Sequence, residues 1–407
     1  MIRNLATAGV FTSFRQRNFR FFLASESLTR VGDQMETVVL AWVVLVETNS
    51  PFLLGVFGAL LFFGTLIAPY FGVLADRHDR RNLLLGVRAV TGGTAMGILV
   101  LSLTGSLEVW HVFVLASFSG IARTFGNVLR EVLTADIVDQ RMLANAIGLT
   151  RSASDVTQVV APIIGGALLN WAGISPAFFL VVAMYLVAAY SAYMIRLPAR
   201  ELTGVATSVF RNLTEAGGYI RRNNVVLALL LMAFLVNFTA LPLSHGLMPV
   251  FAKDVLEGGP MSLAGLVSAL FAGAFLGSMG IAALTRLQRG GRFLIVMALV
   301  WHAALLVFSQ SQWFGASLAV LLVVGMFQSF TMVTMATLLI RVTPVEFRGR
   351  VMGARSLAVY GLPMGLLVAG GLAETQGAPF AVAFNSLVGI VAVLVVATSL
   401  RKLWHLS

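Results

Sequence analysis

Cysteine is absent from the 407-residue sequence, and charged side chains are few. Without cysteine the chain cannot form disulfides, thiolate metal sites or cysteine nucleophiles, and its redox compartment stays undetermined. Lys, Arg, Asp and Glu make up 11% of the residues, whereas soluble globular domains have about 25%. Hydrophobic residues make up 58%, and the mean hydropathy is +0.90. This composition excludes a soluble globular protein and predicts that most of the surface faces lipid.

Motifs for nucleotide hydrolysis and for metal binding are also missing. No Walker loop occurs, so ATP is not expected as a direct energy source. The five histidines show neither metal-ligand spacing nor a carboxylate partner suited to catalysis, which makes an intramembrane hydrolase the least favoured interpretation. We therefore expect no enzymatic activity, no metal and no cofactor.

Apolar segments about as long as a bilayer is thick recur twelve times along the chain. Short turn signals separate most of them, which suits helical hairpins packed antiparallel. The sequence thus predicts an all-α polytopic membrane protein with twelve transmembrane helices. The expected spans are 19–47, 52–75, 83–104, 109–134, 144–170, 174–195, 224–252, 262–285, 292–310, 313–340, 349–373 and 378–400.

One interruption, at residues 197–223, is longer and polar. It is expected to be a linker between two pseudo-symmetric six-helix bundles, at 1–196 and 224–407. The two halves also repeat weakly, since the Gly-Gly pair of the fifth span recurs in the eleventh at an offset of 205 residues. Parallel six-helix repeats joined by a polar linker are typical of alternating-access transporters.

Positive charge is concentrated on one side of the predicted membrane protein. The two tails, the linker and the loops after the second, eighth and tenth spans carry most of the arginines, whereas the opposite side has only Lys253. Such an asymmetry predicts that both termini and the linker are cytoplasmic. It also accounts for the net charge of +11 without a nucleic-acid partner.

The loop after the second span, GVLADRHDRRNLLL at residues 72–85, gathers charges between two apolar runs. Each charge at the bilayer centre would cost about 2.5 to 3.5 kcal/mol, so the cluster must lie at a membrane surface. It resembles the signature that the major facilitator superfamily has in this loop, Gly-x-Leu-Ala-Asp-Arg followed by a basic pair. Residues 15–33, the turn at 49–51, and Asp79 in place of the usual Gly resemble the drug and siderophore exporter branch, which includes enterobactin and macrolide efflux proteins.

The resemblance implies that this loop acts as a conformational latch. Asp76 could pair with Arg80 or Arg81 and interact with the N-terminus of the eleventh helix. Glu131 or Asp136, at the end of the fourth helix, could receive an arginine. These contacts would hold the outward-facing state, although the arginines could instead only anchor the loop to anionic lipid. The expected latch residues are Gly72, Asp76, Arg77, Arg80, Arg81, Glu131 and Asp136.

The first span contains an unusual number of charges. Glu26, Arg30 and Asp33 share one helical face, and Glu36 is displaced from it. Arg30 could neutralise one carboxylate, while another could be held protonated in a low-dielectric environment, as a proton carrier requires. Asp33 is the first candidate because it lies deepest and matches the Gly-Asp position of the family. The alternative is an ion-pair network that does not titrate during transport.

Charged residues of other helices are expected near the same cavity. Arg123 in the fourth helix resembles the intramembrane arginine that the superfamily uses beside its proton site. Arg151 and Asp155 are four residues apart in the fifth helix and can pair. Arg88 is expected to reach the membrane interface by snorkelling. Helices seven to twelve have no acid near mid-membrane, so protonation is expected in the N-terminal half.

The fifth span contains Ala161-Pro162-Ile-Ile-Gly165-Gly166, which resembles the Gly-Pro-x-x-Gly-Gly element of exporting antiporters. Proline removes a helical hydrogen bond and glycine permits close approach, so Pro162, Gly165 and Gly166 are expected to form a bendable contact between the halves. Both residue types also serve packing alone in membrane helices. The element favours efflux over uptake.

The substrate is expected to be a small hydrophobic or amphipathic molecule, because aromatic, methionine and amide side chains recur in the spans. Many of them could instead face lipid or neighbouring helices. The candidate cavity residues are Trp42, Asn127, Gln158, Asn237, Phe238, Gln328, Met332 and Tyr360.

Together these features predict a monomeric, proton-coupled exporter of compounds such as drugs or siderophores in the bacterial inner membrane. A lipid or lysophospholipid flippase, or an uncoupled facilitator, would use the same fold and is the main alternative. A sensor or scaffold without transport activity is disfavoured because it needs no buried charges in the first and fourth helices.

Overall fold

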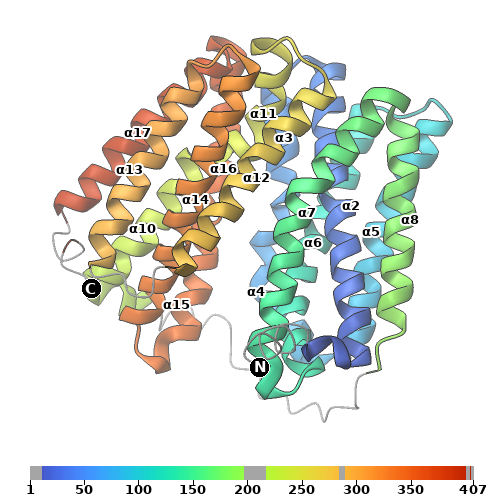
Figure 1. Ribbon diagram of the computed structural model, residues 1–407, viewed down its shortest axis with the longest axis horizontal. Helices are drawn as coiled ribbons and strands as arrows, with labels where there is room; N and C mark the ends of the chain where they lie inside the picture. Colours follow the sequence, from blue (N-terminus) through green and yellow to red (C-terminus); the bar gives the residue numbers. More distant parts are fainter. Residues whose placement is uncertain (1–11, 197–216, 284–288, 400–403, 405–407) are drawn as a thin grey trace, which may run out of the picture. The chain divides into compact units, whose positions relative to one another are not determined.

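The computed structural model describes residues 12–196, 217–283, 289–399 and 404. All regular elements in these ranges are helices, which confirms the predicted all-α class. Contacts divide the chain into two compact units: residues 1–40 with 61–206, and residues 41–60 with 207–407. Within each unit the long helices run along one another (Figure 1). The hairpin at 41–60 therefore groups with the second half of the chain.

The first unit contains the N-terminal half without that hairpin. In it α5 packs against both α6 and α8. The Asp79 side chain caps α5 by accepting a hydrogen bond from the backbone N–H of Arg81, and Gly173, with φ of +85°, separates α7 from α8. The helices are the first part of α2 (Arg17–Thr48), α4 (Ala68–Arg77), α5 (Arg80–Leu103), α6 (Val109–Ile137), α7 (Leu143–Ala172) and α8 (Ile174–Tyr193). Short 3₁₀ segments occupy Thr12–Arg15, Phe63–Ile67 and Gln140–Met142.

The second unit contains the hairpin and the C-terminal half. Its closest helix pair is α12 and α14, where Gly273 and Gly277 lie against the backbone of Leu322 and Met326. Gly273 and Gly277 of α12 thus serve helix packing. The helices are α3 (Pro51–Leu61), α10 (Asn224–Thr239), α11 (Met248–Val250), α12 (Pro260–Ala283), α13 (Gly290–Ser309), α14 (Phe314–Val342), α15 (Val345–Ala358), α16 (Gly361–Gln376) and α17 (Ala378–Ser399). Two π-helical turns, Leu243–Leu247 and Phe251–Val255, flank α11.

The start of α3 is fixed inside the second unit by α16. Ser50 accepts a hydrogen bond from the backbone N–H of Leu53 at 3.1 Å, and the carboxylate of Glu374 accepts from the N–H of Phe52 at 2.9 Å and from the Ser50 hydroxyl. Lys253 donates to the side chain of Asn49 at 2.5 Å. The backbone N–H groups of Phe52 and Leu53, which have no partner within the helix, are thus satisfied by side chains.

Ten helical segments among the described residues are long and apolar enough to cross a membrane, and the bent segment from Pro51 to Arg77 would make eleven. The remaining long helix, α2, carries the charges of the first predicted span. The second predicted span, 52–75, is broken rather than continuous. Pro69 stands at the beginning of α4, where its missing N–H cannot continue a preceding helix.

Candidate functional site

A buried ion pair joins α2 to α5 in the first unit. The carboxylate of Glu26 contacts Arg88, and the two side chains are 7% and 3% exposed. Arg88 also donates through Nε to the Ser25 hydroxyl at 3.2 Å. The prediction that Arg88 snorkels to the membrane interface is therefore wrong. Its partner lies on a helix distant in sequence, so the charge is neutralised inside the unit instead of in the headgroup region.

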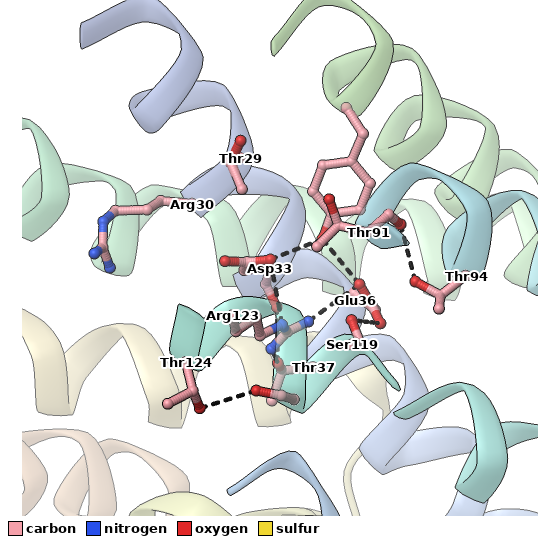
Figure 2. Close-up of polar contacts among 12 residues, drawn as sticks. Thr29, Arg30, Asp33, Glu36, Thr37, Thr91, Thr94, Ser119, Arg123 and Thr124 are labelled. Carbon is pink, nitrogen blue, oxygen red and sulfur yellow. Dashed lines mark hydrogen bonds and ion pairs between the residues drawn. The ribbon is translucent and has the colours of Figure 1, made fainter. Parts of the chain in front are cut away.

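A second cluster lies about two to three turns further along α2. Arg123 of α6 approaches Asp33 with Nε at 3.2 Å and Glu36 with Nη2 at 3.1 Å, as Figure 2 shows. Its Nη1 donates to the Thr37 hydroxyl at 2.7 Å, and the Ser119 hydroxyl donates to Glu36 at 3.0 Å. The side chains of Glu36, Arg123 and Asp33 are 3%, 16% and 21% exposed. Two carboxylates thus share one guanidinium in a largely buried site.

Tyr185 of α8 completes this cluster and was not found by sequence reasoning. Its hydroxyl lies 2.9 Å from Asp33 Oδ1 and 2.8 Å from Glu36 Oε2. The absence of a side chain at Gly32 makes room for its ring, because a Cβ there would lie 2.5 Å from a ring carbon. The sequence carries no signal for this contact, because nothing in it relates α8 to α2. The cluster therefore contains a third titratable group between the two carboxylates.

The spacing in the first span predicts that Arg30 neutralises a carboxylate on its own helix, and this prediction is wrong. Arg30 donates to the side-chain oxygen of Asn127 at 3.1 Å, while Glu26 and Asp33 pair with arginines of α5 and α6. The reason is that Arg88 and Arg123 approach these acids from facing helices. A small polar recess is lined by Glu26, Arg30, Asp33, Arg88, Arg123 and Asn127.

The predicted pair on α7 is confirmed. Arg151 approaches Asp155 with Nε at 3.2 Å, and their side chains are 71% and 12% exposed. The carboxylate is therefore more enclosed than its partner. The pair is separate from the Asp33–Glu36–Arg123 contacts, although Asp155 is within electrostatic range of Arg30.

A further ion-pair cluster lies near the C-terminal ends of α4 and α6 and the N-terminal end of α5. Arg80 contacts Asp136 at 2.5 Å and Asp76 at 3.2 Å, so both pairings expected for the latch residues occur within the first unit. Arg81 instead donates to the backbone oxygen of Tyr193 at 2.7 Å and lies over its ring. The expected contact of Asp76 with the eleventh helix would join different units and stays a prediction.

The other latch candidates differ from Arg80 in burial. Arg77 and Glu131 are exposed, whereas Arg80 is buried. A Cβ at Gly72 would meet nothing within 4 Å, so packing does not require glycine at this position. Of the seven latch candidates, the structure brings Asp76, Arg80 and Asp136 together.

The proline–glycine element lies in the middle of α7, which continues through Pro162 as one helix. Pro162, Gly165 and Gly166 are all buried. A Cβ at Gly165 would lie 3.1 Å from the Cα of Met35, so α7 and α2 are in close contact inside the first unit. The glycine is thus explained by helix packing within one unit, and a role in bending stays a prediction.

The predicted cavity residues are divided between the units. Asn127 lines the polar recess, and Gln158 donates to the backbone of Ser154 at 3.4 Å. In the second unit, Asn237 is buried and donates to the Ala233 carbonyl at 2.7 Å, and Phe238 stacks on Phe234. Trp42, Gln328, Met332 and Tyr360 are partly buried in that unit. A common substrate cavity that includes all eight stays a prediction.

The charged cluster offers carboxyl groups that can exchange a proton. In the described part of the chain no three His, Asp or Glu side chains are grouped so that they could hold a metal ion. The cluster has two carboxylates, one guanidinium and one phenol, so its fully ionised acids exceed its positive charge by one. Such an excess of negative charge is costly in a low-dielectric interior.

Comparison with protein families gives a match over residues 23–366 to the model of the Major Facilitator Superfamily. Macrolide efflux protein A of Streptococcus pyogenes is 20% identical over 281 residues, which are 68% of this chain and 69% of that protein. The multidrug efflux pump Tap of Mycolicibacterium fortuitum is 24% identical over 363 residues, covering 85% and 87% of the two chains.

Solved structures show the same fold. A mutant of the nucleoside transporter NupG superposes with a TM-score of 0.73 at 13% identity, covering 95% of this chain and all of that one. An occupied, inward-facing bacterial homologue of the human lysosomal transporter Spinster gives a TM-score of 0.71 at 14% identity, with 96% of each chain covered.

Proposed function

Because the chain belongs to the major facilitator superfamily, whose members are non-enzymatic membrane transporters, we propose that it exports hydrophobic or amphipathic small molecules in exchange for protons. The names of its relatives support export, since they include a macrolide efflux protein and multidrug efflux pumps. The apolar, aromatic and methionine-rich composition of the spans supports a substrate of low polarity.

The observation that carries the proton-coupled part is the Asp33–Glu36–Arg123 cluster. Charges within a transmembrane bundle are costly, and they mark ion or proton pathways when they persist. Here one arginine faces two carboxylates, so the site holds more acid than base. Asp33 is the more accessible of the two carboxylates and is the member best placed to exchange a proton with solvent.

The remaining elements fit an alternating-access cycle. The proposed moving bodies are the two six-helix halves at 1–196 and 224–407, with both termini on the cytoplasmic side of a bacterial inner membrane. The contacts of Arg80 with Asp76 and Asp136 would act as the cytoplasmic latch, forming in one state and breaking in another. The exporter would work as a monomer in which each half supplies one side of the substrate path.

The test is substrate-triggered proton movement in proteoliposomes with a pH-sensitive dye in the lumen. A macrolide and a panel of hydrophobic cationic dyes would serve as probes, and Asp33→Asn would be compared with wild type. We expect proton flux that requires both substrate and Asp33. Glu47→Gln, a change at an exposed acid of α2 outside the cluster and the latch, should leave the flux unchanged. Equal substrate movement without a pH gradient and in Asp33→Asn would contradict antiport and favour a facilitator or a lipid flippase.

A further inference from the structure

The Tyr185 hydroxyl is within hydrogen-bond distance of two carboxylates at once. Its oxygen lies 2.9 Å from Asp33 Oδ1 and 2.8 Å from Glu36 Oε2. A phenol has one hydrogen to donate, so it can satisfy only one of these oxygens fully. If both carboxylates were ionised, the other contact would place two oxygen lone pairs against each other without a hydrogen between them.

The other donors around the two carboxylates do not supply the missing hydrogen. The Ser119 hydroxyl donates to the opposite oxygen of Glu36, Oε1, and the Thr37 hydroxyl donates to the backbone carbonyl of Asp33. Arg123 lies 3.1 to 3.2 Å from both acids, but its Nε and Nη2 hydrogens are not aligned for hydrogen bonds. The guanidinium therefore contributes one positive charge, which balances one of the two carboxylates.

We propose that Asp33 and Glu36 hold a single proton between them, bridged by Tyr185, and that this shared proton is the one exchanged during transport. In the protonated state, the neutral carboxyl group donates to the Tyr185 oxygen, and the Tyr185 hydroxyl donates to the remaining carboxylate. All three oxygens are then satisfied, and one negative charge faces one positive charge. The proposal deepens the proposed function and rests on it only for the exchange during transport.

In this scheme Tyr185 is a positioning residue, not the carrier. It keeps the two carboxyl oxygens in register so that either can hold the proton. Because both carboxyl oxygens lie within 2.9 Å of the phenol oxygen, the bridge couples the buried Glu36 to the more exposed Asp33. The proton thus belongs to the pair rather than to Asp33 alone.

The other charged groups around the pair are already matched. On α2 and α5, Glu26 is neutralised by Arg88. On α7, Asp155 is paired with Arg151. Arg30, which also lines the recess, donates to the side-chain oxygen of Asn127. Facing the pair, α6 contributes Arg123 and α8 contributes Tyr185.

Infrared difference spectroscopy of the purified full-length protein in lipid tests this directly. A pH titration should reveal the C=O stretching band of one protonated carboxyl group, and this band should be lost in Asp33→Asn. Tyr185→Phe keeps the ring packed against Gly32 but removes the bridge. We expect the midpoint of the band in Tyr185→Phe to fall by about one pH unit, a tenfold loss of proton affinity, because the protonated state loses two hydrogen bonds and the ionised state only one.

Tyr190→Phe is the matched control, because Tyr190 is on the same helix and 62% exposed. It should leave both band and midpoint unchanged. A band that persists in Asp33→Asn, or a midpoint that is the same in Tyr185→Phe and wild type, would overturn the shared proton. The spectra need no substrate, so they separate the two proposals. A band that behaves as expected alongside absent proton flux would reject antiport and retain the shared proton.

Discussion

The two units differ in the polar groups that they bury: the first contains ion pairs, and the described part of the second contains neutral hydrogen-bonded groups. The first unit buries Glu26 with Arg88, and Asp33 and Glu36 with Arg123. In the described part of the second unit, Lys253 pairs with Asp254 at 3.5 Å, in the π-helical turn next to the loop before α12.

The interior of the second unit uses neutral groups. His302 bonds to the Thr239 hydroxyl and to the Ala298 carbonyl, each at 2.8 Å, and Asn237 donates to a carbonyl of its own helix. Neutral groups that satisfy one another cost little in a membrane, whereas buried ion pairs are often no better for stability than apolar residues of similar size. The contrast therefore suggests that the charges of the first unit serve transport and that the polar groups of the second serve packing.

Removing Arg123 should have the largest effect on this contrast. Arg123→Met leaves Asp33 and Glu36 without the cation they share, and breaking a buried pair in this way costs about 3 to 5 kcal/mol of unfolding free energy. Equilibrium unfolding in mixed detergent micelles would measure the loss. Arg123→Lys keeps the positive charge but not the planar guanidinium group that faces both acids, so its loss of unfolding free energy should be smaller. A loss in Arg123→Met as small as that of a second-unit variant would remove the distinction between the units.

Variants of the Glu26–Arg88 pair test whether these buried charges serve stability or proton coupling. Arg88→Met or Glu26→Gln alone should cost about 3 kcal/mol, because each leaves one buried group without its partner. The double variant should recover most of that stability and retain proton flux in proteoliposomes, since the Asp33–Glu36 pair is intact. Loss of flux in a well-folded double variant would show that this pair also takes part in coupling.

The sequence was sufficient for the helices and for contacts between groups that are close along the chain. Apolar runs of bilayer length predicted most helix ends to within a few residues. In lipid the backbone N–H and C=O groups must bond to one another, and a helix does this within a single segment. The pairs Arg80–Asp76 and Arg151–Asp155 follow from a spacing of four residues.

The sequence was insufficient where partners come from distant helices. Arg88 and Tyr185 reach α2 from positions 62 and 149 residues away from their acids, at depths that depend on how α5 and α8 are aligned with α2. Tyr185 is one of 6 tyrosines in the chain, and nothing in its local sequence distinguishes it. The intrahelical spacing of Arg30 was misleading for the same reason, since facing helices supplied better partners.

In the second unit, Thr239→Val should have a moderate effect. It removes the hydroxyl bonded to His302 while nearly keeping the shape, and losing one partner of a buried hydrogen bond costs about 1 to 2 kcal/mol. Thermal unfolding in detergent would detect the loss, and the proton flux per substrate should not change. A change in that ratio would assign His302 a part in coupling and weaken the contrast between the units.

The smallest effects are expected in the cluster around Arg80, and they should differ between its two acids. Asp136 is 31% exposed and lies 2.5 Å from the buried Arg80, whereas Asp76 is 70% exposed. Asp136→Asn should therefore cost about 1 kcal/mol or more, and Asp76→Asn less than about 0.5 kcal/mol, because solvent screens an exposed pair. Double-mutant cycles with Arg80→Gln would assign each contact its energy. If Asp76→Asn instead slows transport strongly while leaving stability unchanged, its importance lies in a state of the cycle other than this one, as a latch residue requires.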